Sequence, residues 1–121
     1  MTRLGSTVLS AGILVLALPL TAAAQSAKAE QGAALFTSQK CTLCHSVAGK
    51  GNPKGSLDGV GAKRKADEIR QWILDPDAMR AKTKATRTPA MKQLKLTEDQ
   101  VDALVAYLSS LKGAHSDGDA R

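Results

Sequence analysis

Large aromatic side chains are almost absent from this sequence of 121 residues, which holds one Phe, one Trp and one Tyr. The length is that of one domain, and a small domain with so few large side chains buries little apolar surface by itself. Such domains often depend on a cross-link or a bound cofactor for stability. The scarcity of aromatics also disfavours nucleic acid as a partner, although the formal charge is +6.

A hydrophobic run long enough to cross a membrane is also lacking. The most apolar stretch, residues 8–20, is shorter than the roughly 20 residues that span a bilayer. Arg3 precedes it and Thr21-Ala22-Ala23-Ala24 follows it, which is typical of a secretory signal peptide cleaved after Ala24. An uncleaved anchor helix is the alternative. We predict that residues 1–24 are removed and that the remaining chain is exported to the periplasm, with no stable membrane insertion.

No alternating strand pattern is found, and we predict an all-α fold. Helices are expected over residues 26–39 and 66–74, with a shorter turn of helix over residues 77–84. Residues 48–62, rich in Gly, and residues 86–95 are expected to be loops. The last helix starts at a capping box formed by Thr97 and Gln100, and Gly113 ends it. Residues 25–113 would form the domain and residues 114–121 a flexible polar tail.

The chain has only two cysteines, Cys41 and Cys44, and His45 directly follows the second. Two thiols three residues apart lie on one side of a helical turn, where they can bond to the two vinyl groups on one edge of a haem. His45 can then bring its imidazole to the iron. C-x-x-C-H is typical of c-type haem attachment, so the motif predicts one covalent haem c with its iron.

Three other interpretations of the two cysteines were weighed. A disulfide between Cys41 and Cys44 would close a very short loop and stabilise little. A thioredoxin-like redox pair needs a preceding strand, whereas the residues before Cys41 look helical. A structural zinc site needs four ligands, and the fourth would have to be His115 in the predicted tail. Haem attachment is favoured over all three.

A second axial ligand can come from a methionine. Met1 leaves with the signal peptide, so Met79 and Met91 remain. Met91 follows Pro89 and Ala90 in the predicted loop, where an irregular segment can cover the open face of the haem. We predict that Met91 is the ligand and that Met79, on a helical stretch, fills the core. Ligation by His115 is disfavoured. With His45 and Met91 on the iron, both axial positions are occupied, which suits electron transfer.

With these features in place, the sequence resembles the class I c-type cytochromes, the monohaem cytochrome c family, over nearly all of residues 25–113. Gly32 and Phe36 match the family's first helix, and Tyr107 matches the aromatic of its last helix. In the family these two helices cross. Residues 57–61 with Ile69, Trp72, Ile73, Asp75 and Pro76 resemble its bacterial branch, and Pro89-Ala90-Met91 is similar to its Pro and Met loop.

The resemblance implies a small helical fold wrapped around one haem and a function as a periplasmic one-electron carrier, not an enzyme. In the family, a proline carbonyl shortly before the residue that matches Leu57 accepts a hydrogen bond from the axial histidine. Here Gly55 and Ser56 stand there, and Pro53 is the nearest proline, so Pro53 or another backbone carbonyl must take this role. A haem subunit of a periplasmic dehydrogenase or oxidase complex is the alternative function.

Basic residues cluster between Ala78 and Thr97, where no acidic residue occurs. This run brackets Met91 and comprises Arg80, Lys82, Lys84, Arg87, Lys92 and Lys95, and Lys63-Arg64-Lys65 adds a second cluster. Charge runs are usually solvated faces. Around a haem edge, however, positive charge would steer docking to an acidic surface on a redox partner. Such encounters are small and transient, and we expect a monomer.

Overall fold

The computed structural model describes residues 20–113. Most of the predicted signal peptide and the predicted tail, with His115, lie outside these residues. The elements in chain order are α1 Leu20–Ser38, the 3-10 turn η1 Cys41–Leu43, β1 Ser46–Val47, β2 Lys50–Gly51, the 3-10 turn η2 Pro53–Gly55, α2 Val60–Lys63, α3 Ala66–Leu74, α4 Pro76–Thr83 and α5 Glu98–Ser110. The expected helical fold is confirmed, and its β structure within the described range is one two-stranded antiparallel sheet and an isolated bridge between Ser46 and Ser56.

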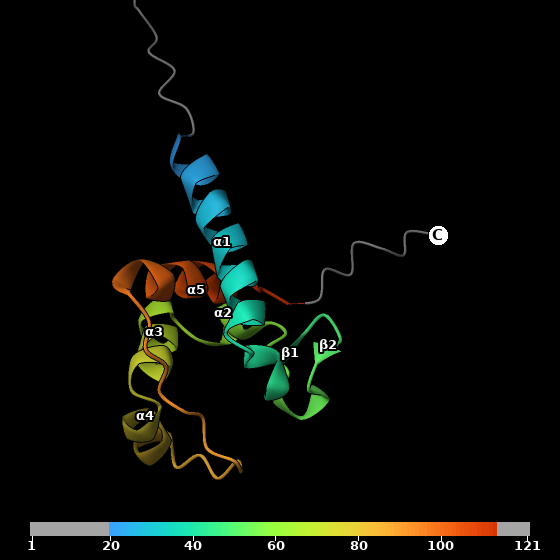
Figure 1. The fold of residues 1–121 in the computed structure, drawn as a ribbon, viewed down its shortest axis with the longest axis vertical. Coiled ribbons are helices and arrows are strands. Elements are labelled where there is room, and N and C mark those ends of the chain that lie inside the picture. Colours follow the sequence, from blue (N-terminus) through green and yellow to red (C-terminus); the bar gives the residue numbers. More distant parts are fainter. Residues whose placement is uncertain (1–19, 114–121) are drawn as a thin grey trace, which may run out of the picture.

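Helices α1 and α5 cross each other and form the largest helix–helix contact (Figure 1). The crossing is close because Gly32 of α1 has no side chain. A Cβ atom there would overlap the carbonyl oxygen of Ala103 and would lie 2.6 Å from Cβ of Tyr107. Next to it the rings of Phe36 and Tyr107 meet edge to face, with centroids 5.8 Å apart. The crossing thus brings together the three residues that the resemblance assigns to it, Gly32, Phe36 and Tyr107.

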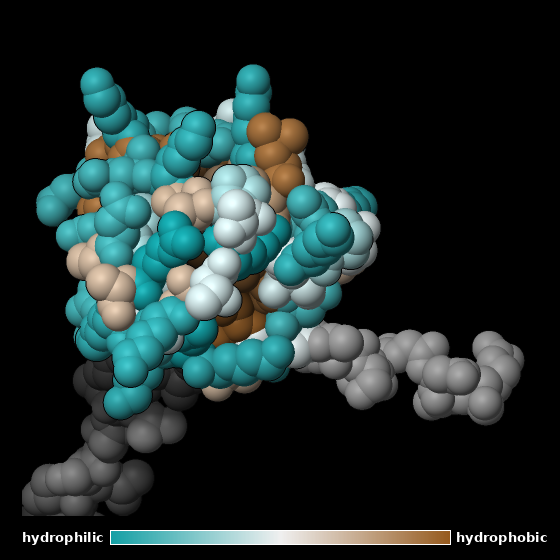
Figure 2. All heavy atoms as spheres, turned by 90° about the horizontal axis from the view of Figure 1, so that it is seen from below, coloured by the Kyte–Doolittle hydropathy of each residue, from teal (hydrophilic) through white to brown (hydrophobic). Residues whose placement is uncertain are grey.

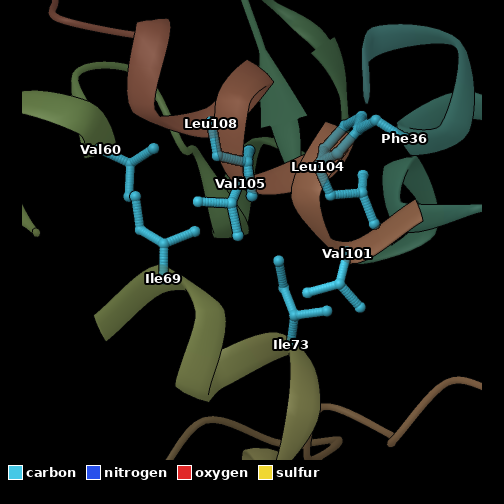
Figure 3. Close-up of a cluster of buried hydrophobic side chains, with 8 residues drawn as sticks. All are labelled: Phe36, Val60, Ile69, Ile73, Val101, Leu104, Val105 and Leu108. Carbon is cyan, nitrogen blue, oxygen red and sulfur yellow. The ribbon is translucent and has the colours of Figure 1, made fainter. Parts of the chain in front are cut away.

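The core lies where α3 packs against α5 below the crossing. Ile69 and Ile73 of α3 point toward Val101, Val105 and Leu108 of α5 (Figure 3). All five side chains are buried because they share one face of each helix at spacings of three and four residues. The capping box predicted for α5 is confirmed, with both reciprocal hydrogen bonds between Thr97 and Gln100 formed. That cap determines where α5 begins and therefore which of its residues face α3.

Residues 46–58 fold back on the turn that carries the cysteines, in a way that was not predicted. Strands β1 and β2 pair as a short hairpin, and Leu57 N–H donates to the carbonyl of Ser46 at 2.8 Å. Asn52 stabilises the return, because its side chain donates to Leu43 and its Oδ1 caps η2. Glycine-rich segments allow such turns, but their sequence does not specify which backbone groups pair. The loop expected over residues 48–62 is therefore largely ordered by backbone hydrogen bonds.

Two boundaries differ from the prediction. Helix α1 is already formed at Leu20, the first described residue, upstream of the expected start at residue 26, and it runs through the predicted cleavage point after Ala24. Helix α2, which was expected to be loop, forms one turn beside α5, where Gly61 N–H donates to Leu111 at 2.8 Å. Within residues 20–113, no helix has the length and apolar character that a membrane span requires.

We expect Gly32→Ala to destabilise the protein by about 1–3 kcal/mol, because the added methyl group overpacks the crossing of α1 and α5. At an exposed helical position, Gly→Ala would instead stabilise the protein by about 1 kcal/mol. The sign of the change in unfolding free energy therefore shows whether α1 and α5 are in close contact at Gly32. Denaturant unfolding of the purified protein measures this change, with Gln31→Ala at an exposed neighbouring position as control. Unchanged or increased stability of Gly32→Ala would contradict the close crossing.

Candidate functional site

A largely apolar cavity of ≈ 280 Å³ lies beside the core. Its lining includes side chains of the core cluster, namely Phe36, Val60, Ile69, Ile73, Leu104 and Leu108. Cys41, Cys44 and His45 line it, and so does Met91 from the loop before α5. Figure 2 shows hydrophobic surface in a recess between hydrophilic side chains. The fold therefore brings the C-x-x-C-H motif and the predicted methionine to one cavity.

The two cysteines lie at η1 immediately after α1, and both are half-buried and free. Burial raises the pKa of the Cys41 thiol, an effect to which the nearby Cys44 adds. Reactive thiols of redox pairs instead have a lowered pKa and a preceding strand. The structure thus disfavours the thioredoxin-like interpretation. Among residues 20–113, no three His, Cys, Asp or Glu side chains gather as a metal site, and His115, the fourth ligand that a zinc site would need, lies outside this range.

His45 is oriented by one hydrogen bond from its Nδ1 to the carbonyl of Gly55, at 3.0 Å. A carbonyl only accepts, so Nδ1 carries the proton and Nε2 of the neutral ring keeps its lone pair. Burial also lowers the pKa of His45 from 6.5, and the charge of Arg87 acts in the same direction, against the hydrogen bond to Gly55. The imidazole is therefore held neutral near pH 7, the form that binds metals.

The acceptor for His45 is Gly55 and not Pro53, the nearest proline, which corrects the expected assignment. Pro53 begins η2 and is exposed, and one 3-10 turn later the chain presents the carbonyl of Gly55 to the ring. The backbone of Gly55 is helical, a conformation open to any residue. A glycine is therefore needed there because there is no space for a side chain. A Cβ atom would overlap the carbonyl oxygen of Cys44 and the guanidinium of Arg87.

Of the two candidate methionines, the cavity is lined by Met91 and not by Met79. Met79 is buried on α4, 4% exposed, outside the cavity lining. Met91 is half-buried in a segment that also lines the cavity with Pro89, Ala90 and Leu94. This segment is fastened to α3, because the side chain of Gln93 donates to the carbonyl of Leu74 at 2.8 Å. The structure thus places Met91 at the cavity and Met79 away from it, and ligation of iron by Met91 stays a prediction.

Polar groups on the cavity were not identified as site residues from the sequence. Nε1 of Trp72 is buried and has no hydrogen-bond partner, and Trp72 lines the cavity. Arg64, Arg80 and Arg87 line it too. Trp72 could have been singled out as the only Trp, placed between Ile69 and Ile73 on one helix face. Arg87 is indistinguishable in sequence from the other basic residues of its run.

These residues fit a haem. Its macrocycle is flat and apolar, like most of the lining, and its two carboxylates suit an unpartnered indole N–H and nearby guanidinium groups. Cys41 and Cys44 would hold the vinyl edge, and His45 Nε2 with the Met91 sulfur would be ligands of the kinds that haem iron accepts. The unpartnered N–H of Trp72 is the observation on which this fit depends most, because a buried donor without an acceptor is costly.

A family model described as Cytochrome c matches residues 29–112 of this chain. Two curated relatives are each described as cytochrome c oxidase subunit 2. The one from Alkalihalophilus pseudofirmus is 29% identical over 93 residues, which cover 69% of this chain and 26% of the relative. The one from Bacillus subtilis is 30% identical over 103 residues, which cover 74% and 28%. The chain thus spans about a quarter of the length of these relatives. No solved structure matches it significantly.

We expect Trp72→Phe to lower both the stability and the reduction potential of the haem-loaded protein. Loss of a hydrogen bond to a carboxylate costs about 1–3 kcal/mol. The carboxylate would then carry more uncompensated negative charge, which favours the oxidised, more positive centre. Denaturant unfolding and redox titration measure the two effects.

Val105→Ala, a core truncation outside the cavity lining, is the control for Trp72→Phe. It should lower stability by loss of packing and leave the potential unchanged. If Nε1 of Trp72 has no partner in the loaded protein, the potential of Trp72→Phe will equal that of the parent.

Proposed function

Since this chain belongs to the cytochrome c family and carries a covalently bound haem c with its iron, we propose that it is an exported one-electron carrier with His45 and Met91 as axial ligands. Cys41 and Cys44 are proposed to form the thioether bonds. The observation that carries this proposal is the meeting of all four side chains at one apolar cavity. Electron transfer through haem follows from the family, whereas the ligand pair and the periplasmic location are proposals.

The residues around the cavity determine what the centre can do. When bound, the haem supplies reversible one-electron exchange between Fe(II) and Fe(III). His45 is held neutral and pointed by Gly55, and Met91 is held by its anchored loop, so little has to reorganise when the charge changes. The apolar side chains exclude water, which shifts the potential upward because the charged state is disfavoured. With both axial positions filled, no substrate would reach the metal.

The exposed lysines around the Met91 segment are the proposed docking surface for an acidic redox partner. Lys82, Lys84, Lys92 and Lys95 are exposed, and in the described part of the chain none of them forms an ion pair. The arginines of the same run differ. Arg80 donates to the carbonyl of Ala85 at 3.1 Å, and Arg87 donates to the carbonyl of Cys44. The lysines therefore present free charge, which speeds encounters without requiring a large interface.

A second candidate function, a haem subunit of an oxidase or dehydrogenase complex, is favoured by the two relatives described as cytochrome c oxidase subunit 2. The two functions differ in their assembly. Purification from the native membrane and soluble fractions would separate them. A free carrier elutes at its own size at all concentrations, whereas a subunit remains with a larger complex on dilution.

We expect Met91→Ala to abolish the thioether–iron absorption band of the oxidised protein and to lower its reduction potential, because a thioether ligand stabilises Fe(II). Met79→Leu is the matched control, since Met79 is buried away from the cavity, and it should keep both properties. An optical spectrum and a redox titration of each purified protein measure them. An unaltered spectrum of Met91→Ala would eliminate Met91 as the ligand.

We expect Lys84→Glu with Lys92→Glu to slow oxidation by ferricyanide several-fold at low ionic strength, because the positive face that attracts this anion is weakened. Oxidation by a cationic cobalt complex should speed up. Stopped-flow rates across a range of salt concentrations measure both reactions. The double Lys→Arg variant at the same positions, which keeps the charge, should match the parent. Equal rates for all three proteins would show that these lysines do not steer encounters.

A further inference from the structure

Arg87 makes a contact that separates it from the rest of the basic run. Its Nη2 donates to the backbone carbonyl of Cys44, the residue before the axial histidine. The two residues are 43 positions apart in the chain. Arg87 belongs to the segment that leads to Met91, four residues later. One side chain thus connects the segment of one proposed axial ligand to the segment of the other.

The guanidinium also lies against Gly55, whose carbonyl orients His45. It occupies the space that a Cβ atom would need, and the carbonyl of Cys44 occupies the rest. Because Gly55 is buried and its backbone is helical, the missing side chain makes room for this contact.

On the other side of Met91, Gln93 fastens the segment to the end of α3 through the carbonyl of Leu74, at 2.8 Å. Between these two anchors, the segment 88–92 has no other side-chain hydrogen bond to a distant part of the described chain. Met91 therefore lies between two residues, Arg87 and Gln93, whose hydrogen bonds hold the segment in place. Losing either anchor would lengthen the free loop and allow the methionine to leave the cavity more often.

We propose that Arg87 is a positioning residue for the haem centre, which ties the Met91 segment to the attachment motif and places a permanent positive charge at the edge of the haem cavity. This inference rests on the proposed ligation by His45 and Met91. The guanidinium is suited to both tasks because it remains charged and its several N–H groups have a fixed geometry. The hydrogen bond to Cys44 favours the state in which Met91 is bound to the iron. The positive charge of Arg87 favours the reduced state, because Fe(II) carries one positive charge less than Fe(III).

Two substitutions at Arg87 distinguish the effect of its hydrogen bond to Cys44 from the effect of its positive charge. Arg87→Gln removes the charge and the long reach, so imidazole should displace Met91 at about tenfold lower concentration, and the reduction potential should fall. Arg87→Lys keeps the charge and loses the planar fork. Its potential should stay close to that of the parent, while its imidazole affinity rises. Optical titration with imidazole, followed at the thioether–iron band, and redox titration measure the two properties.

Lys50→Gln is the charge-matched control, because Lys50 is exposed, does not line the cavity and lies outside the proposed docking surface. It removes an equal charge and should change neither property beyond the small shift expected of a screened surface charge. Covalent haem content and the denaturant midpoint of each variant establish that it is folded. If Arg87→Gln does not accumulate, Arg87→Lys still tests the tie.

The outcomes distinguish this inference from the proposed function. A parent protein with the thioether–iron band, together with equal imidazole affinities and potentials for Arg87→Gln and Lys50→Gln, overturns the role of Arg87 alone. A parent protein without the band refutes ligation by Met91, and the tie is refuted with it. In that case the potentials of the two variants still decide whether the charge of Arg87 acts on the iron.

Discussion

The hydrogen bond from His45 to the carbonyl of Gly55 is the constraint around which the site is arranged. It leaves Nε2 as the free nitrogen of a neutral ring, and so it determines which atom can meet the iron. To place this carbonyl, the chain forms the β1–β2 hairpin and the η2 turn, and Asn52 links that turn to the cysteine segment. Gly55 has no side chain because Cys44 and Arg87 crowd it. The hairpin, which contributes little to the core, is therefore best understood as support for one imidazole.

The core and the proposed haem site share side chains. Ile69, Ile73, Leu104 and Leu108 belong to the buried cluster and also line the cavity. A chain with three aromatic residues has little else with which to fill such a space. A covalently held haem would complete the interior that the helices leave open, which couples folding to cofactor attachment. The buried indole N–H of Trp72 also indicates that a haem completes the interior, since burial of a donor without an acceptor is unfavourable.

Much of the fold and part of the site were predictable from local patterns. The capping box of α5, the apolar face of α3 and the C-x-x-C-H motif depend on residues close in sequence, and the structure confirms the two helices and places the motif on the cavity. Predictions failed where partners are distant. Pro53 was the nearest proline, but the geometry of η2 brings Gly55 to His45. The order within residues 48–62 was missed, because its backbone pairings are not encoded by residue type.

The sequence by itself determined the cofactor class. It also predicted the attachment residues and favoured Met91 over Met79 as a ligand, because thiol spacing and the segments that carry the methionines are local properties. Only the tertiary structure decided which carbonyl orients His45, that Trp72 has an unpartnered N–H at the cavity, and that Arg87 differs from the lysines beside it. The physical reason is the same in each case. Hydrogen bonding and burial depend on groups brought together by folding, across 10 residues for His45 and 43 for Arg87.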